Sequence, residues 1–211
     1  MKGCDNVTEL YNRYPNLKQC KTAIDSALNA ICDTYQSGGK LLACGNGGSC
    51  ADCEHIVGEL MKGFLLYRSQ CGLEEKFSDL NFDDAEYMAK HLQGALPAIS
   101  LPHQTALTSA FANDVAADMI YAQLVYGYAK KDDILVCIST SGNSKNVVYA
   151  AKTAKMLGVK TLALTGKNES ALSDICNVTI RVPETETYKV QELHLPVYHY
   201  LCAEVEAKFF K

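Results

Sequence analysis

The sequence lacks three features that would direct it to a membrane, a secretory route or a nucleic acid. No apolar run approaches the roughly 20 residues that span a bilayer. Residues 1–9 include acidic and amide side chains and no apolar core, so they do not resemble a signal peptide. With 20 basic and 24 acidic side chains, the net charge of −4 argues against a nucleic-acid partner. We expect a cytoplasmic protein, and the charge still allows a small anionic ligand held in a local cradle.

The ten cysteines lack the arrangement of a disulfide framework or of a structural zinc site. Without a secretory signal, disulfides are not expected. Cys50 and Cys53 form one C-x-x-C pair, whereas a structural zinc site normally has two such pairs. Several others, such as Cys44 and Cys137, lie within apolar runs and are interpreted as small hydrophobic residues. A redox role for Cys50 and Cys53 stays open.

Short apolar runs alternate with helical patterns along the 211 residues. Continuously apolar runs, typical of strands buried on both faces of a parallel sheet, occupy 40–44, 97–101, 133–139, 159–164 and 178–182. Helical spacing of apolar residues predicts helices over 16–36, 49–61, 105–112, 117–129, 144–157 and 187–209. The alternation predicts an α/β fold with a doubly wound parallel sheet. Because such sheets bind ligands beyond the carboxyl ends of their strands, we expect function in the loops after residues 44, 101, 139 and 164.

Residues 64–94 interrupt this alternation. A polar stretch over 74–84 precedes a short helical pattern over 84–92. We interpret 64–94 as an insertion that forms a solvated cover within a single domain over 1–211. An N-terminal helical segment over 1–37 precedes the first strand.

Two loops between a strand and a helix have chemistry suited to phosphate. In the first, Gly45 to Ser49, glycines let the backbone approach a ligand at a helix N-terminus, although a tight turn explains the same pattern. In the second, Ser139 to Ser144, four hydroxyl groups lie within six residues. Capping a helix needs only one hydroxyl, so the second loop predicts a phosphate site.

Two further groups of residues could carry acid–base or metal chemistry. His55 and Glu59 lie four residues apart on one helix face, where a surface ion pair is the ordinary explanation. Gln191 and His199 lie eight residues apart, a rise of about 12 Å in a straight helix, so one metal ion could hardly bind both. Three arrangements would resolve this: a bend at Pro196, a helix that begins after Gln191, or sites completed by neighbouring subunits.

Four stretches together resemble one family, the sugar isomerase (SIS) domain proteins, and within it the phosphoheptose isomerases. They are CGNGGSCADCEHIVGEL over 44–60, FAND over 111–114, ISTSGNSKNV over 138–147, and LALTGK with RVPETETYKVQELHLPVYH up to 199. The resemblance covers most of residues 20–205. It implies a flavodoxin-like three-layer sandwich and conversion of sedoheptulose 7-phosphate to glycero-manno-heptose 7-phosphate through an enediol. It also implies homotetramers with active sites at subunit interfaces.

The resemblance implies a role for each matching residue. Sugar contacts would come from Asn46, Gly47, Gly48, Ser49, Asn113, Asp114 and Gln191. The phosphate would bind to Ser139, Thr140, Ser141 and Ser144. Zinc, one ion per subunit, would bind to His55, Glu59, Gln191 and His199. Glu59 would be the catalytic base and His199 the acid.

Three departures from the family pattern leave the substrate open: the length of 64–94, Pro196, and Asn168 to Ser170 in place of a frequent Gly-Gly. One alternative is isomerisation of another sugar phosphate. The other is a non-catalytic adaptor or sensor, because relatives that bind the bacterial replication initiator share the pattern but lack the last histidine. The presence of His199 together with Glu59 favours the enzyme.

Overall fold

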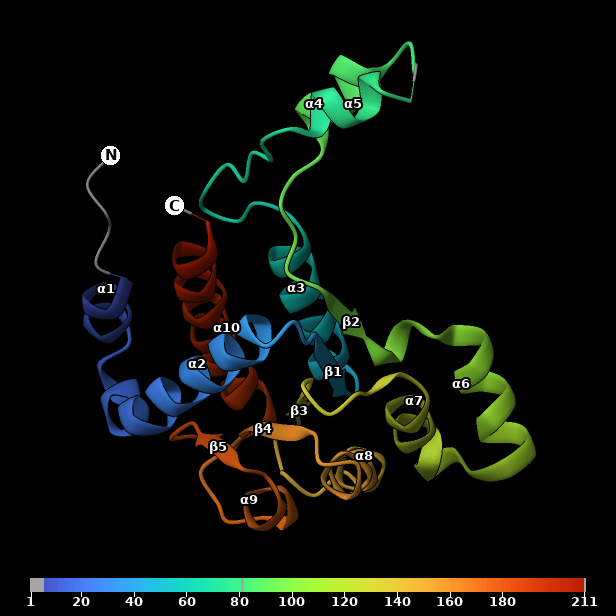
Figure 1. Cartoon of the computed structure of the whole chain (residues 1–211). Coiled ribbons are helices and arrows are strands. Elements are labelled where there is room, and N and C mark those ends of the chain that lie inside the picture. The colour runs from blue at the N-terminus through green and yellow to red at the C-terminus, as the bar shows by residue number, and fades with distance from the viewer. Residues whose placement is uncertain (1–5, 81, 211) are drawn as a thin grey trace.

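A computed structural model describes residues 6–80 and 82–210, which form a parallel five-stranded sheet with helices on both faces (Figure 1). The strands are β1 (Leu41–Gly45), β2 (Ala98–Ser100), β3 (Ile134–Ile138), β4 (Lys160–Thr165) and β5 (Val178–Arg181). Every neighbouring pair is parallel, in the order β2-β1-β3-β4-β5. The doubly wound parallel sheet expected from the sequence is confirmed, with every strand end within about one residue of its prediction.

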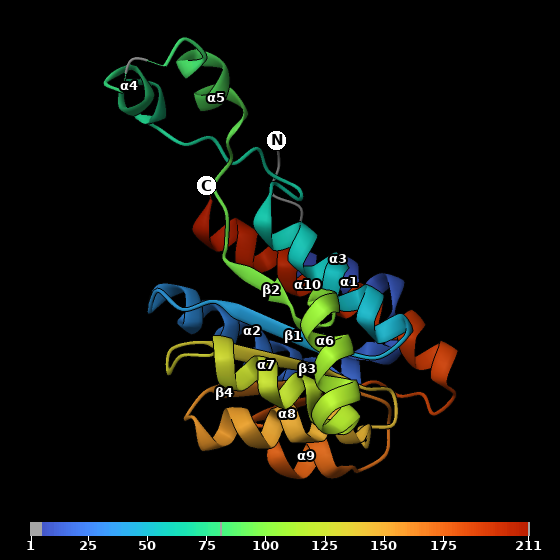
Figure 2. The same ribbon diagram turned by 90° about the vertical axis from the view of Figure 1, so that its right-hand side faces the viewer.

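The sheet separates two apolar cores, and alternate residues of each strand face one or the other. On β3, Ile134 and Val136 face the first core, and Leu135 and Cys137 face the second. The first face is covered by α1 (Asn6–Arg13), α2 (Lys21–Gln36), α3 (Gly48–Met61) and α10 (Thr187–Phe209). The second face is covered by α7 (Ile120–Tyr128), α8 (Lys145–Met156) and α9 (Ala171–Ile175) (Figure 2). Burial on both faces explains why the strands are continuously apolar.

Two predicted helices are divided in the structure. The pattern over 16–36 begins as a 3₁₀ helix, Pro15–Cys20, and continues as α2. The segment between α6 (Thr105–Phe111) and α7 contains a π-helical turn, Ala112–Ala116, and a 3₁₀ turn, Ala117–Met119. A hydrophobic pattern sets which face is buried but does not distinguish these tighter and wider turns from a regular α-helix. The short helix α9 was not predicted.

Residues 64–94, called the arm below, project from the body of the molecule. The arm carries α4 (Leu73–Ser78) and α5 (Ala85–His91), which stand clear of the sheet (Figure 1). The pattern over 84–92 predicted α5, whereas α4 lies in the stretch interpreted as polar. The arm extends away from the sheet and exposes aromatic side chains such as Tyr67, Phe82 and Tyr87.

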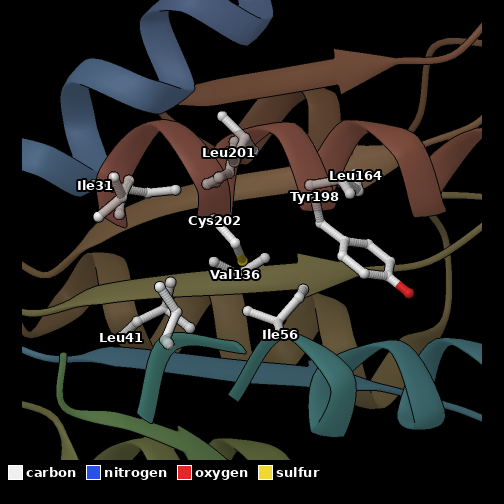
Figure 3. A pocket seen from close by; sticks show the side chains of 11 residues that line it. Ile31, Leu41, Ile56, Val136, Leu164, Tyr198, Leu201 and Cys202 are labelled. Carbon is white, nitrogen blue, oxygen red and sulfur yellow. The ribbon is translucent and has the colours of Figure 1, made fainter. Parts of the chain in front are cut away.

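A small apolar cavity of about 20 Å³ lies between the sheet, α3 and α10 (Figure 3). Ile56 of α3, Val136 of β3 and Leu201 of α10 are among its lining residues. An apolar space of this size has no polar partners for a water molecule, so it is a packing defect. The ligand site must lie elsewhere.

Every cysteine in the described residues is free, and most are buried in the cores. Burial raises the pKa of the Cys53 thiol, which donates a hydrogen bond to the Ser49 carbonyl oxygen at 3.1 Å. Thiolate chemistry at this C-x-x-C pair is therefore disfavoured. Within the same residues, no helix is long and apolar enough to cross a bilayer.

Candidate active site

The strand order reverses between β1 and β3, at the point of a parallel sheet where the following loops diverge and ligands usually bind. These are the two loops that the sequence marked as functional. Asn46, after β1, and Asn146, in α8, exchange two side-chain hydrogen bonds of 2.9 Å at this carboxyl edge of the sheet. The Tyr121 hydroxyl donates to the Gly45 carbonyl oxygen at 2.7 Å and also contacts Asn46. Sequence reasoning missed both Tyr121 and Asn146, of which only Asn146 lies close to the second loop in the sequence.

The glycine loop brings the start of α3 against α10. Gly47 has a positive φ of 55°, which favours glycine because a side chain there is strained. A Cβ atom at Gly48 would collide with the amide end of the Gln191 side chain, so this glycine lets that amide lie against the start of α3. Ser49 is buried, whereas Asn46, Gly47 and Gly48 are exposed to a ligand.

The hydroxyl-rich loop lies between β3 and α8. Ser139 is buried and its hydroxyl donates to the Ser144 hydroxyl at 3.1 Å, while Ser141 is exposed. Ser144 immediately precedes α8 and makes no capping hydrogen bond through its side chain. Helix capping therefore does not account for this hydroxyl, and the amino terminus of α8 favours a negative charge beside the loop. Thr140 is half-buried between these serines.

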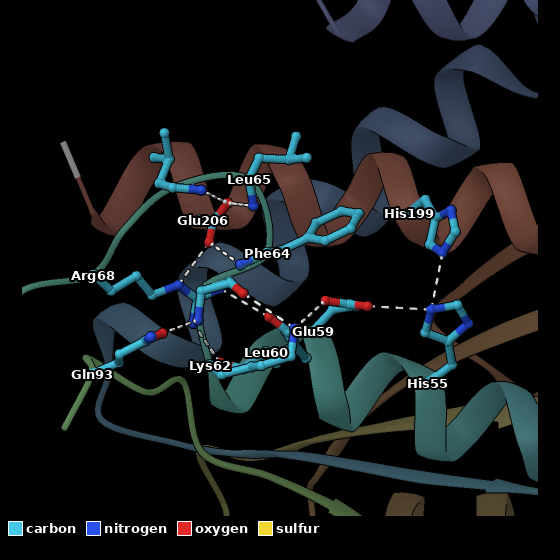
Figure 4. A network of polar contacts seen from close by, with 12 residues as sticks. His55, Glu59, Leu60, Lys62, Phe64, Leu65, Arg68, Gln93, His199 and Glu206 are labelled. Carbon is cyan, nitrogen blue, oxygen red and sulfur yellow. Dashed lines mark hydrogen bonds and ion pairs between the residues drawn. The ribbon is translucent and has the colours of Figure 1, made fainter. Parts of the chain in front are cut away.

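His55, Glu59 and His199 meet between α3 and α10 and are called the acid–base cluster below (Figure 4). The Nε2 atom of His55 lies 3.3 Å from Glu59 Oε1 and 3.3 Å from His199 Nε2. Glu59 also accepts a bond from Lys62 at 3.0 Å. Burial, and then the neighbouring His55, lower the pKa of His199, which favours its neutral form. A carboxylate beside a neutral imidazole is suited to moving protons.

A tyrosine hydroxyl orients the His55 ring through its Nδ1 atom. The Tyr198 hydroxyl lies 3.0 Å from His55 Nδ1 and donates to Asp52 Oδ1 at 3.2 Å. Burial raises the pKa values of both Tyr198 and Asp52. Because the Tyr198 hydroxyl donates its hydrogen bond to Asp52, the Tyr198 oxygen accepts a hydrogen bond from the Nδ1–H group of His55. The other ring nitrogen of His55, Nε2, then faces the acid–base cluster. Sequence reasoning missed both residues, although Asp52 lies one helical turn before His55 and Tyr198 directly precedes His199.

Gln191 lies two turns away from the cluster. Helix α10 runs unbroken from Thr187 to Phe209 through Pro196, so the idea that the helix begins after Gln191 is wrong. Gln191 instead lies beside Gly48, just as His199 lies beside His55. Helices α3 and α10 therefore run side by side in the same direction, with the glycine loop at one end and the acid–base cluster about 10–12 Å further along.

Within one chain, two candidate residues do not lie beside the helix pair α3 and α10. Asn113 and Asp114 lie on the π-helical turn after α6, are exposed, and contact each other at 2.8 Å. Figure 1 shows α6 at the side of the molecule, apart from α10.

His194, a neighbour of Gln191 in sequence, is fully buried in the core, where burial lowers its pKa to about 4.

A groove of about 360 Å³ opens beside His199. Its walls come from α1, from α10 and from the start of the arm, including Arg13, Tyr14 and Phe64. The Phe64 ring lies 5.5 Å from the His199 ring between centroids. Of the acid–base cluster, His199 is thus accessible from this side.

The acid–base cluster was tested for its fit to zinc. Its imidazole nitrogens and carboxylate oxygens are donors that zinc accepts. Across residues 6–80 and 82–210, however, no group of three or more His, Cys, Asp or Glu side chains is arranged to hold a metal ion. Gln191 is too far along α10 to complete one. A single chain therefore does not bring all four proposed zinc ligands together, and the proton transfers derived below are assigned to protein residues alone.

Comparison with known proteins identifies the family. A family model described as the SIS domain matches residues 4–73 and 84–166. The phosphoheptose isomerase of Citrifermentans bemidjiense is 36% identical over 188 residues, 89% of this chain and 85% of that protein. The phosphoheptose isomerase of Rhodospirillum rubrum is 32% identical over 203 residues, 96% of this chain and 93% of that protein. The chain belongs to the phosphoheptose isomerase family of SIS-domain proteins.

A solved structure of the family has the same fold. The structure of a phosphoheptose isomerase from Francisella tularensis is 28% identical, with a TM-score of 0.73, and the match covers 98% of this chain and all of that one. The family and the fold class inferred from the sequence are confirmed. The residues between the two matched segments of the family model, 74–83, lie in the arm.

Proposed function

We propose that this phosphoheptose isomerase family member converts sedoheptulose 7-phosphate to glycero-manno-heptose 7-phosphate. The chain is an isomerase by its family, and its relatives carry this name at 32–36% identity over most of their length. One observation supports the proposal most: the glycine loop and the acid–base cluster lie at two ends of the helix pair α3 and α10, and Asn46 of the glycine loop bonds to Asn146, beside the hydroxyl-rich loop. The groups that bind the phosphate are thereby held apart from the groups that act on the reacting carbons, so phosphate binding contributes energy at a distance from the chemistry.

The spacing favours a long substrate. The glycine loop and Gln191 lie at the starts of α3 and α10, and the acid–base cluster lies two turns further, about 10–12 Å away. An extended seven-carbon chain reaches further from its phosphate than a five-carbon chain does. The exposed amide of Asn46, the exposed hydroxyl of Ser141 and the half-buried amide of Gln191 suit the phosphate end and the adjacent sugar hydroxyls.

The residues of the cluster have the groups that ketose–aldose isomerisation needs. Glu59 removes the proton from C1 of the ketose while His199 gives a proton to the C2 carbonyl oxygen, which forms an enediol. In the second half, His199 takes the proton of the C1 hydroxyl and Glu59 returns its proton to C2. The Tyr198 hydroxyl and Asp52 hold His55 in place beside both groups.

Zinc and oligomerisation belong to the same proposal. Zinc, one ion per subunit, would bind His55, Glu59 and His199 of one chain together with Gln191 of a neighbouring chain, and would supply Lewis-acid chemistry at the sugar oxygens. Because Gln191 and His199 lie two turns apart on α10, we propose a homotetramer in which neighbouring subunits complete each site, with Asn113 and Asp114 of one chain serving another. The enzyme would work in the cytoplasm on a soluble sugar phosphate.

The proposal is tested by incubating the purified full chain with sedoheptulose 7-phosphate, fructose 6-phosphate and arabinose 5-phosphate and following each sugar by NMR. We expect turnover of the heptulose phosphate alone or far above the others. Turnover of another phosphosugar in its place would change the substrate. A complete lack of turnover and of proton exchange at C1 would favour a non-catalytic sensor.

A further inference from the structure

A buried ion pair connects the two helices that carry the catalytic groups. Arg68, at the base of the arm, and Glu206, in α10, are both fully buried, and Arg68 Nε donates to Glu206 Oε1 at 2.8 Å (Figure 4). Glu206 lies seven residues after His199, two turns along the same side of α10. No part of the proposed reaction uses this pair directly.

The arginine contacts the helix turn from which Glu59 projects. Arg68 Nη2 donates to the Glu59 carbonyl oxygen at 2.9 Å, and Nη1 donates to the Leu60 carbonyl oxygen at 2.6 Å. These carbonyls lie in the last turn of α3, where no backbone partner within the helix is available. The guanidinium group thus fixes the end of α3 from outside the helix.

The carboxylate of Glu206 completes the connection. It accepts bonds of 2.7, 2.7 and 3.0 Å from the backbone N–H groups of Phe64, Leu65 and Leu66, in addition to the bond from Arg68. Its two oxygens therefore accept four hydrogen bonds. The segment from α3 to Arg68 is anchored to α10 at one point, and the Phe64 ring within it lies against His199.

The stability of the fold does not account for such a pair. Removing two charges from water costs so much that a well-packed apolar pair is often equally stable or more stable. What an apolar pair cannot do is hold carbonyl and N–H groups of three segments in fixed directions. The directional bonds go to the turn of Glu59 and to the helix of His199.

We propose that the Arg68–Glu206 pair is a positioning device that sets the carboxylate of Glu59 relative to the imidazole of His199. This inference rests on the proposed isomerase function. Neither residue touches the substrate, so the pair is needed for turnover and not for binding of the sugar phosphate. A displacement of about 1 Å between catalytic groups can lower a rate by about 10²-fold.

The test compares Glu206→Gln and Arg68→Lys with Asp133→Asn. Asp133 is a matched control because it is also buried, pairs with Lys40 and accepts backbone bonds from Lys40 and Lys130. It lies at the amino ends of β1 and β3, opposite to the carboxyl edge that carries the two loops. For each full-length variant, kcat and KM with sedoheptulose 7-phosphate are measured at a temperature where circular dichroism shows it folded.

We expect Glu206→Gln and Arg68→Lys to lower kcat by about 10- to 10²-fold with KM within about threefold of wild type, whereas Asp133→Asn lowers the melting temperature and keeps kcat. Unchanged kcat in either folded variant, or an equal loss in Asp133→Asn, overturns the inference. Failure of both variants to fold while Asp133→Asn folds also overturns it, because the pair would then serve the fold. An inactive wild-type chain would instead refute the proposed function itself, and the inference with it.

Discussion

The Nε2 atoms of His55 and His199 lie 3.3 Å apart, although the residues are 144 positions apart in the sequence. Helix α3 follows β1 and α10 follows β5, and both cover the same face of the sheet. The two histidines are therefore brought together by the topology of the fold. Glu59, one turn after His55, joins them at 3.3 Å from His55 Nε2.

If this cluster performs the proton transfer, removing either proton carrier should abolish turnover and spare binding. Glu59→Gln keeps the size of the side chain but cannot accept a proton, and His199→Asn loses the imidazole. Each change should lower kcat by at least about 10²-fold while sugar-phosphate affinity, measured by calorimetry, changes little. In heavy water the wild-type enzyme should also place deuterium on the transferred carbon. Wild-type activity in both variants would show that the cluster is structural.

The hydroxyl-rich loop should govern affinity. Ser141→Ala combined with Ser144→Ala removes two hydroxyls beside the amino terminus of α8 and should weaken binding of sedoheptulose 7-phosphate by at least about tenfold. Calorimetry measures this, and Ser26→Ala, whose hydroxyl bonds only within α2, is the control. Equal affinity in the double variant and the control would reject this loop as the phosphate site.

Much of this arrangement was predictable from the sequence, for reasons that particular elements make clear. Strands β1 and β3 were predicted because burial on both faces leaves continuous apolar runs. The hydroxyl-rich loop over 139–144 was found because its four hydroxyls exceed what a helix cap needs. Tyr198 and Asp52 were missed because an aromatic residue and an acid at helical spacing are common in any amphipathic helix. The direction in which the arm projects was not predictable, because no sequence pattern specifies which surface a solvated insertion faces.

Metal analysis decides the role of zinc. The proposal that His55, Glu59, Gln191 and His199 bind zinc predicts about one zinc ion per chain in protein purified without chelator. His55→Ala should lower that content, whereas His91→Ala on the arm should not, because His91 lies in α5, away from the cluster. EDTA should then lower activity, and added zinc should restore it. Metal-free protein with full activity would remove zinc from the proposal and leave Glu59 and His199 as the catalytic pair.

His194 should make the enzyme sensitive to acid. Burial lowers its pKa to about 4, below the usual value near 6.5, so the unfolded chain binds this proton more readily than the folded chain. Stability from this group is present above pH of about 6.5 and is lost as the pH falls toward 4, by about 3 kcal/mol in total. Urea unfolding at several pH values should show a weaker acid dependence in His194→Leu than in wild type. The exposed His91→Gln should behave as wild type, and equal slopes for His194→Leu and wild type would contradict the assignment.

The separation of Gln191 and His199 on α10 predicts that subunits share active sites. Each of Gln191→Ala and His199→Asn should be nearly inactive by itself. If a site takes Gln191 from one chain and His199 from its neighbour, a mixed oligomer contains some sites with both residues intact. Random mixing would restore about a quarter of the sites. Co-expression with two affinity tags isolates the mixed oligomer, and its turnover is compared with that of each single variant.

Restored turnover in the mixed oligomer requires the two residues to act across a subunit boundary. If both acted within one chain, every chain would carry one defect and mixing would restore nothing. A control mixture of Glu59→Gln with His199→Asn distinguishes the geometry further, because His55, Glu59 and His199 meet within one chain. That mixture should stay inactive. A control mixture as active as the first would place His199 with Glu59 of another subunit and would overturn the cluster as the catalytic unit.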